Sequence, residues 1–152
     1  VGATSFTSAQ NKVAHINKQE LIKAMPAYAA AQADIDKLGK TYQETIQESF
    51  KELDTKLKQY NAEAESQSEE TNMTRMQEVE EIKQSLGQYQ RQAQEDLQEK
   101  EINLLKPIVE KADNAIKAVA KAQGYQYVFD SAMLIVADGK DLMADVKKQL
   151  GI

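Results

Sequence analysis

The stretch that decides the fold is IDKLGKTYQETIQESFKELDTKLKQY, residues 35–60. Apolar side chains recur along it and just beyond it at steps of three or four residues, at Ile35, Leu38, Tyr42, Ile46, Phe50, Leu53, Leu57, Tyr60 and Ala64. This spacing is typical of the a and d positions of a coiled coil. It predicts one long helix whose apolar side chains form a single narrow seam.

A second seam with the same spacing follows a short polar stretch. Residues 66–72, SQSEETN, offer no apolar contact and predict a turn. The seam then continues at Met73, Met76, Val79, Ile82, Leu86, Tyr89, Ala93, Leu97, Leu104 and Ile108. Two such seams on either side of a turn predict a long antiparallel two-helix coiled-coil arm over residues 35–104.

Strand signals flank the arm at both chain ends. Residues 13–16, VAHI, carry β-branched side chains that favour a strand, and Asn17 is placed to cap a following helix. Residues 125–130 alternate in polarity, and residues 133–137, MLIVA, form the continuous apolar run typical of a buried strand. The predicted fold class is therefore α+β, mostly α, with a small β body formed by strands from both chain ends.

We expect residues 12–34 and 105–152 to form this body. Pro26 can begin the long helix, Gly124 can end the returning one, and residues 141–150 predict a last short helix. Three short strands leave open sheet edges, which self-association would cover. The candidate oligomerisation residues are Val13, Ile16, Val128, Leu134, Ile135 and Val136.

Composition limits the possible functions. The 152 residues are 41% hydrophobic and only 6% aromatic, which is too little apolar surface to pack the whole chain into one globule. The chain has no cysteine and one histidine, His15, which excludes thiolate chemistry and most catalytic triads and zinc sites. No pair of carboxylates is set in an apolar stretch that would shift their pKa values. We therefore expect no enzyme, no metal and no cofactor.

Two further features concern location and partners. Thr7-Ser8-Ala9 resembles the small residues that precede a signal-peptidase cleavage site, so residues 1–11 are either a flexible signal-peptide remnant or an ordinary tail. No run approaches the ~20 apolar residues of a membrane-spanning helix, so we expect no stable membrane insertion. Residues 41–101 carry 7 Lys/Arg against 15 Asp/Glu, a net charge of minus eight, which argues against a nucleic-acid partner.

The arm has candidate binding and hinge residues. Thioether and phenol side chains suit many weak, adaptable contacts, which makes Met73 and Met76 near the turn, and Tyr42, Tyr60 and Tyr89 along the arm, candidates for binding an unfolded partner. The alternative is that these side chains only pack the seam. Gly39 and Pro107 interrupt regular helix chemistry, and we expect them to form a pivot where the arm meets the body.

The chain resembles the Skp/OmpH family of periplasmic chaperones over residues 12–152. The resemblance rests on residues 13–17, on the coiled-coil excursion, and on the closing segments 115–120, 127–130 and 141–150. It implies a homotrimer whose strands form a central β body and whose arms enclose a cavity. In that cavity unfolded outer-membrane proteins would be held without ATP.

One property departs from the family pattern. The best-known members are strongly basic, whereas this chain has a pI near 5.0, so contacts with lipopolysaccharide or anionic membranes are not carried over. A structural coiled-coil adaptor would have the same hairpin and is the alternative reading. A single folded partner that binds with defined stoichiometry would distinguish the adaptor from a chaperone.

Overall fold

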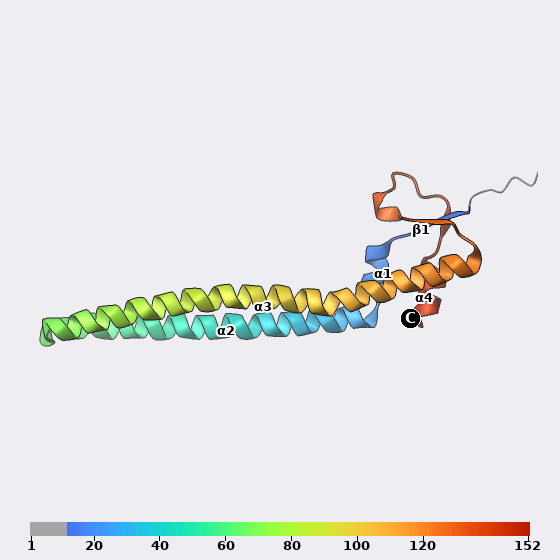
Figure 1. Ribbon diagram of the computed structural model, residues 1–152. Helices are drawn as coiled ribbons and strands as arrows, with labels where there is room; N and C mark the ends of the chain where they lie inside the picture. The colour runs from blue at the N-terminus through green and yellow to red at the C-terminus, as the bar shows by residue number, and fades with distance from the viewer. Residues whose placement is uncertain (1–11) are drawn as a thin grey trace, which may run out of the picture. The chain divides into compact units, whose positions relative to one another are not determined.

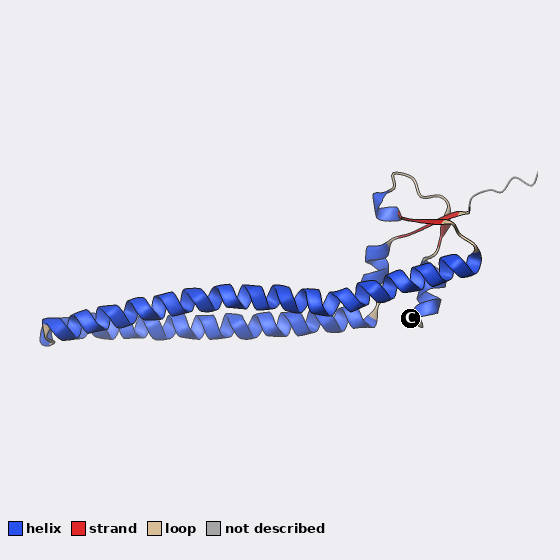
Figure 2. Cartoon of the chain, in the orientation of Figure 1, coloured by secondary structure: helices blue, strands red, loops and turns tan. Residues whose placement is uncertain are grey.

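The computed structural model describes residues 12–152, and the expected signal-peptide remnant lies outside the described residues. The described chain divides into two compact units (Figure 1). We call residues 31–103 the hairpin unit, and residues 12–30 with 104–152 the sheet unit. Helices dominate the chain, and the strands are short (Figure 2).

The hairpin unit consists of parts of two long helices that run antiparallel, side by side (Figure 1). Helix α2 spans Pro26–Glu63 and helix α3 spans Glu69–Gln123. The single-turn helix η1, Ala64–Ser66, lies between them. Tyr42 contacts Asp96 and Tyr60 contacts Glu78, which sets the register of the two helices. The predicted antiparallel coiled-coil pairing is confirmed.

The turn is shorter than the predicted residues 66–72. Helix α3 already begins at Glu69, because the Ser68 hydroxyl accepts a hydrogen bond from the Thr71 backbone N–H at 3.1 Å. The Asn72 side-chain amide donates to the Ala64 carbonyl at 2.9 Å and closes the turn from the other side. Serine is a strong N-cap residue, so the helix begins inside the residues that were expected to form the turn.

The buried seam of the hairpin unit is thin. Leu53, Val79, Leu86 and Ala93 are buried in it, while most other seam positions are half-buried. Three residues that the spacing places in the seam are instead exposed, namely Phe50 at 49%, Met73 at 59% and Met76 at 70%. In a two-helix pair each helix has only one neighbour, so side chains at the margin of the apolar stripe stay in contact with water.

The sheet unit contains a three-stranded sheet with order β2-β1-β3. The central strand β1, Val13–Ile16, pairs in parallel with β2, Tyr127–Asp130, and with β3, Lys140–Asp141. The sheet thus joins strands from both chain ends, as predicted. The long connection between β1 and β2 allows parallel pairing, since parallel strands need a crossover and cannot be joined by a tight turn.

Short helices complete the core of the sheet unit. Helix α1, Lys18–Ala24, begins at the predicted cap, where the Asn17 side-chain oxygen accepts from the Glu20 N–H at 3.0 Å. Helix α4, Met143–Leu150, ends at Gly151, which has a φ of 75° in the left-handed region that favours glycine. With the last turns of α3, these short helices form a core that consists of Ala14, Ile16, Leu21, Met25, Ile108, Ala112, Ala115, Val119, Leu142 and Val146.

The prediction of a buried strand over residues 133–137 is wrong. The segment starts in the short helix η2, Ser131–Met133, and continues without regular structure. Met133, Leu134, Ile135 and Val136 are exposed by 86%, 38%, 103% and 69%. Both edges of β1 are already occupied, by β2 and by β3, so no place beside the central strand is left for this segment.

Candidate functional site

Two of the three candidate tyrosines form one cluster in the hairpin unit. The ring of Tyr42 meets the ring of Tyr89 edge to face, with centroids 5.7 Å apart. The Tyr42 hydroxyl donates to the Asp96 carboxylate at 2.5 Å. This hydrogen bond lowers the pKa of Asp96 and raises the pKa of Tyr42. Both rings are half-buried, so the structure places them in the seam, where the Tyr42 hydroxyl has a hydrogen-bond partner.

The third tyrosine belongs to a charged cluster nearer the turn. Tyr60 donates to Glu78 at 2.5 Å, and Lys56 forms an ion pair with the same carboxylate. The hydrogen bond from Lys56, followed by that from Tyr60, lowers the pKa of Glu78. The guanidinium of Arg75 lies 4.5 Å from the centre of the Tyr60 ring and donates to Glu63 at 2.7 Å. A cation over an aromatic face is attracted by the ring quadrupole, which holds Tyr60 in place.

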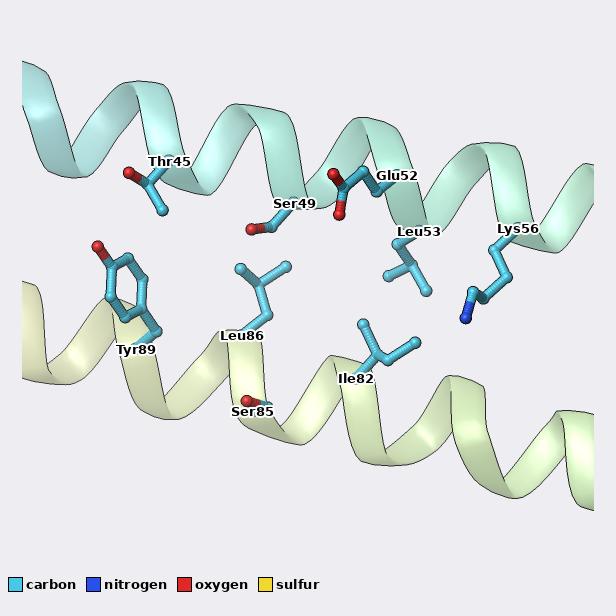
Figure 3. Close-up of a pocket in the computed structure, with 9 residues that line it drawn as sticks. All are labelled: Thr45, Ser49, Glu52, Leu53, Lys56, Ile82, Ser85, Leu86 and Tyr89. Carbon is cyan, nitrogen blue, oxygen red and sulfur yellow. The ribbon is translucent and has the colours of Figure 1, made fainter.

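A notch interrupts the seam between these two clusters (Figure 3). It has a volume of about 360 Å³. Leu53, Ile82 and Leu86 point into the space between the helices, while Ser49 and Ser85 are the small side chains beside them. We call this space the seam notch; Thr45, Glu52, Lys56 and Tyr89 complete its lining. The half-buried Ser49 has a small side chain where a larger apolar one would fill this space.

A second groove, of about 350 Å³, lies at the turn end of the hairpin unit. We call it the tip groove, and its lining is Leu57, Tyr60, Asn61, Ala64, Asn72, Arg75, Met76, Val79, Glu80 and Lys83. It brings together Tyr60 and Met76, two of the candidate binding residues. Met73 lies one turn before Met76 on α3 and is also exposed. The spacing predicted these methionines, whereas it gave no sign of the groove, because the groove depends on the packing across the turn.

The sheet unit exposes apolar side chains of its own. Val13 is paired with Tyr127 in the parallel register, and Phe129 follows two residues later, so the three share one face of the sheet. They are exposed by 46%, 54% and 48%, and the rings of Tyr127 and Phe129 stack with centroids 6.5 Å apart. The sequence reasoning missed Tyr127 and Phe129, although their alternation in the strand was a usable signal.

The other oligomerisation candidates lie in different surroundings. Leu134, Ile135 and Val136 are exposed, and Val128 is half-buried. Ile16 is only 2% exposed and belongs to the core of its own chain. Exposed apolar side chains in such number are typical of surfaces that bind another molecule.

Residues 12–152 bring no three His, Cys, Asp or Glu side chains together in a metal-binding arrangement. No helix within the same range is both long and apolar enough to cross a membrane.

Comparison with known proteins identifies the family. Residues 12–150 match the model of the outer membrane protein (OmpH-like) family. The chain belongs to the OmpH-like family. It is 26% identical to the chaperone protein Skp of Photorhabdus luminescens over 145 residues, which are 93% of this chain and 87% of that protein. Its fold matches the structure of an OmpH-like protein from Caulobacter crescentus CB15 with a TM-score of 0.84, at 14% identity, over 93% of this chain and 85% of the other.

Membership of the Skp/OmpH-like chaperone family accounts for the kind of site found. Members of this family are chaperones and not enzymes, and the candidate residues accordingly form surfaces and grooves. The predicted pivot of this OmpH-like chain stays a prediction. Gly39 lies within α2, and a Cβ atom added to it would lie 3.8 Å from the Cδ2 atom of Leu97. Pro107 lies within α3.

Proposed function

We propose that this protein is an ATP-independent holdase chaperone of the periplasm. It binds unfolded outer-membrane proteins between the hairpin units of a self-associated assembly, a homotrimer, and prevents their aggregation. The observation that carries the proposal is the turn end of the hairpin unit, where Met73 and Met76 are exposed by 59% and 70% beside the tip groove.

The chemistry of the client explains why such a surface is suitable. An unfolded membrane protein presents scattered apolar side chains in no fixed geometry, so its holder needs many weak contacts that adapt. Methionine has three rotatable bonds and a polarisable sulfur, and it fits irregular apolar surfaces better than branched side chains do. The half-buried tyrosines Tyr42, Tyr60 and Tyr89 are tied to the seam, so we assign them a supporting role.

Self-association is supported by the sheet unit. Ile135 and Val136 are exposed by 103% and 69%, and Val13, Tyr127 and Phe129 form an apolar face on the sheet. Covering these side chains with a second and third copy removes apolar surface from water, which stabilises the assembly by about 25 cal/mol per Å². The assembly places several hairpin units around one client.

Replacing Met73 and Met76 together by serine tests the proposal. We expect the variant to suppress the aggregation of a urea-denatured outer-membrane protein several-fold less well than the wild type, because it loses two adaptable apolar contacts. Light scattering after dilution from urea, without nucleotide, measures the effect. Circular dichroism and the mass in solution should not change, since both side chains are exposed.

The matched control is Ile102→Ser, which removes another exposed apolar side chain of the hairpin unit away from the turn. Retained activity in this control and lost activity in the double variant place client binding at the turn end. Equal activity in the wild type and the double variant would remove the methionines from the account. Failure of the wild type on several denatured proteins, together with saturable binding of one folded protein, would favour an adaptor.

A further inference from the structure

The methionines of this chain differ sharply in exposure. Met73 and Met76 stand three residues apart in the first turns of α3 and therefore lie on one face of the helix. They are exposed by 59% and 70%, whereas Met25 in the core of the sheet unit is exposed by 4%. Oxidants in water reach the thioether sulfur of an exposed methionine far more readily than that of a buried one. The turn end of the hairpin thus concentrates two accessible sulfur atoms.

The surroundings of Met76 suit its oxidised form as well as its reduced form. Met76 lines the tip groove with the apolar side chains of Leu57 and Val79. Arg75 and Lys83 line the same groove and supply N–H donors. The Nη1 group of Arg75 has no hydrogen-bond partner within residues 12–152. A sulfoxide oxygen is a strong acceptor, so such donors can hold it where an apolar client side chain would otherwise lie.

We propose that Met73 and Met76 form a reversible oxidation site that switches off client binding in the presence of a hydroperoxide. The sulfur lone pair attacks one peroxide oxygen, the S–O bond forms and the O–O bond breaks. The sulfur is oxidised by two electrons and the peroxide is reduced. After taking the proton of the transferred hydroxyl, the second oxygen leaves as an alcohol, or as water when the oxidant is hydrogen peroxide. A methionine sulfoxide reductase reverses the change with two electrons from thiols, which are oxidised to a disulfide while the oxygen leaves as water.

The loss of client binding follows from the polarity of the sulfoxide group. Two sulfoxides at the turn end weaken client binding by about tenfold, because a polar sulfoxide forfeits most of the free energy gained when methionine leaves water. This consequence rests on the proposed holdase function. The oxidation itself does not, and it is measured separately.

The test exposes the full chain to graded hydrogen peroxide, removes the peroxide, and compares each variant with its own untreated sample. Peptide mass spectrometry measures the sulfoxide fraction at each methionine. Suppression of aggregation of a denatured outer-membrane protein measures client binding. The samples are the wild type, Met73→Leu/Met76→Leu, and Met133→Leu as the control for an exposed methionine of the sheet unit. A further wild-type sample is treated with a methionine sulfoxide reductase after oxidation.

We expect Met73 and Met76 to be oxidised well before Met25. The wild type and Met133→Leu should lose most of their activity, while Met73→Leu/Met76→Leu should keep whatever activity it had before treatment. If the untreated leucine variant suppresses aggregation too weakly to be measured, recovery of wild-type activity after reductase treatment tests the switch instead. A wild type that is oxidised at both positions and still holds its client overturns the inference, as does a loss that the reductase does not reverse. An untreated wild type that holds no client instead overturns the proposed function, and the switch with it.

Discussion

At the scale of single residues, Glu78 connects the two helices near the turn. Its carboxylate accepts hydrogen bonds from Lys56 and Tyr60, and both contacts favour the charged form. They lower the pKa of Glu78 below its ordinary value of 4.5. A carboxyl whose pKa is lower in the folded chain stabilises the fold above the unfolded value, and that contribution is lost as the pH falls through the folded value.

Replacing Glu78 by glutamine should therefore lower the melting temperature at neutral pH, because Lys56 loses its charged partner. The difference from the wild type should shrink as the pH falls from 4.5 through the lower pKa of Glu78 in the folded chain, because the wild-type carboxyl then takes up a proton. Thermal unfolding followed by circular dichroism across this range measures the effect. Glu81→Gln, at an exposed residue that forms no ion pair within the described residues, is the control. A constant difference at all pH values would contradict the assigned role.

The residues that sequence reasoning identified are those whose role follows from spacing or from local chemistry. Asn17 as a cap and Met73 and Met76 at the turn end could be found because a cap and a helix face are local. The ion pair of Lys56 with Glu78 and the stacking of Arg75 on Tyr60 could not be found, since they depend on the register between two helices. A single sequence of acidic and basic residues allows several registers of nearly equal energy.

At the scale of secondary-structure elements, the α2–α3 pair combines a long contact with loose packing. The seam notch holds Ser49 where a larger apolar side chain would fill the space beside Leu53 and Leu86. Unfilled space costs the side chains around it their dispersion contacts. The hairpin unit is therefore less stable than its length suggests, which suits the proposed holding of unfolded clients.

Filling the notch should stabilise the hairpin. Ser49→Leu adds apolar volume above Leu53 and Leu86, and we expect a gain of about 1 kcal/mol in the free energy of unfolding, for a partly buried leucine. Urea unfolding measures the gain. Gln43→Leu, at an exposed position of the same helix, should give no comparable gain. Equal stabilisation by both variants would show that helix propensity, not filling of the notch, is responsible.

The elements also show where pattern reading fails. The two long helices follow from a period sustained over many turns, and no strand pattern imitates that period. Residues 133–137 have the composition of a buried strand, yet they are exposed and irregular. A short apolar run indicates that its burial would be favourable, but it does not indicate which other residues would cover it. In this chain both edges of β1 are occupied, and the run stays exposed.

At the scale of the whole molecule, we propose that self-association through the exposed apolar residues of the sheet unit lets the hairpin units hold a client. Composition predicted too little apolar surface to pack the whole chain into one globule. In agreement, apolar side chains stay exposed in both units, among them Ile135, Val136, Met73 and Met76. The number of subunits could not be predicted from periodicity or composition, because these describe one chain. The homotrimer therefore stays a prediction.

The most direct test is the mass in solution of the protein mixed with one urea-denatured outer-membrane protein, measured by size-exclusion chromatography with light scattering and without nucleotide. The account predicts a soluble complex of three chains of 17.0 kDa each and one client. It also predicts dissociation of the assembly and loss of holding for Ile135→Asp, which places a charge in the proposed interface at no cost to the separate chain. A single 17.0 kDa chain in solution, with the client in the pellet, would contradict the account.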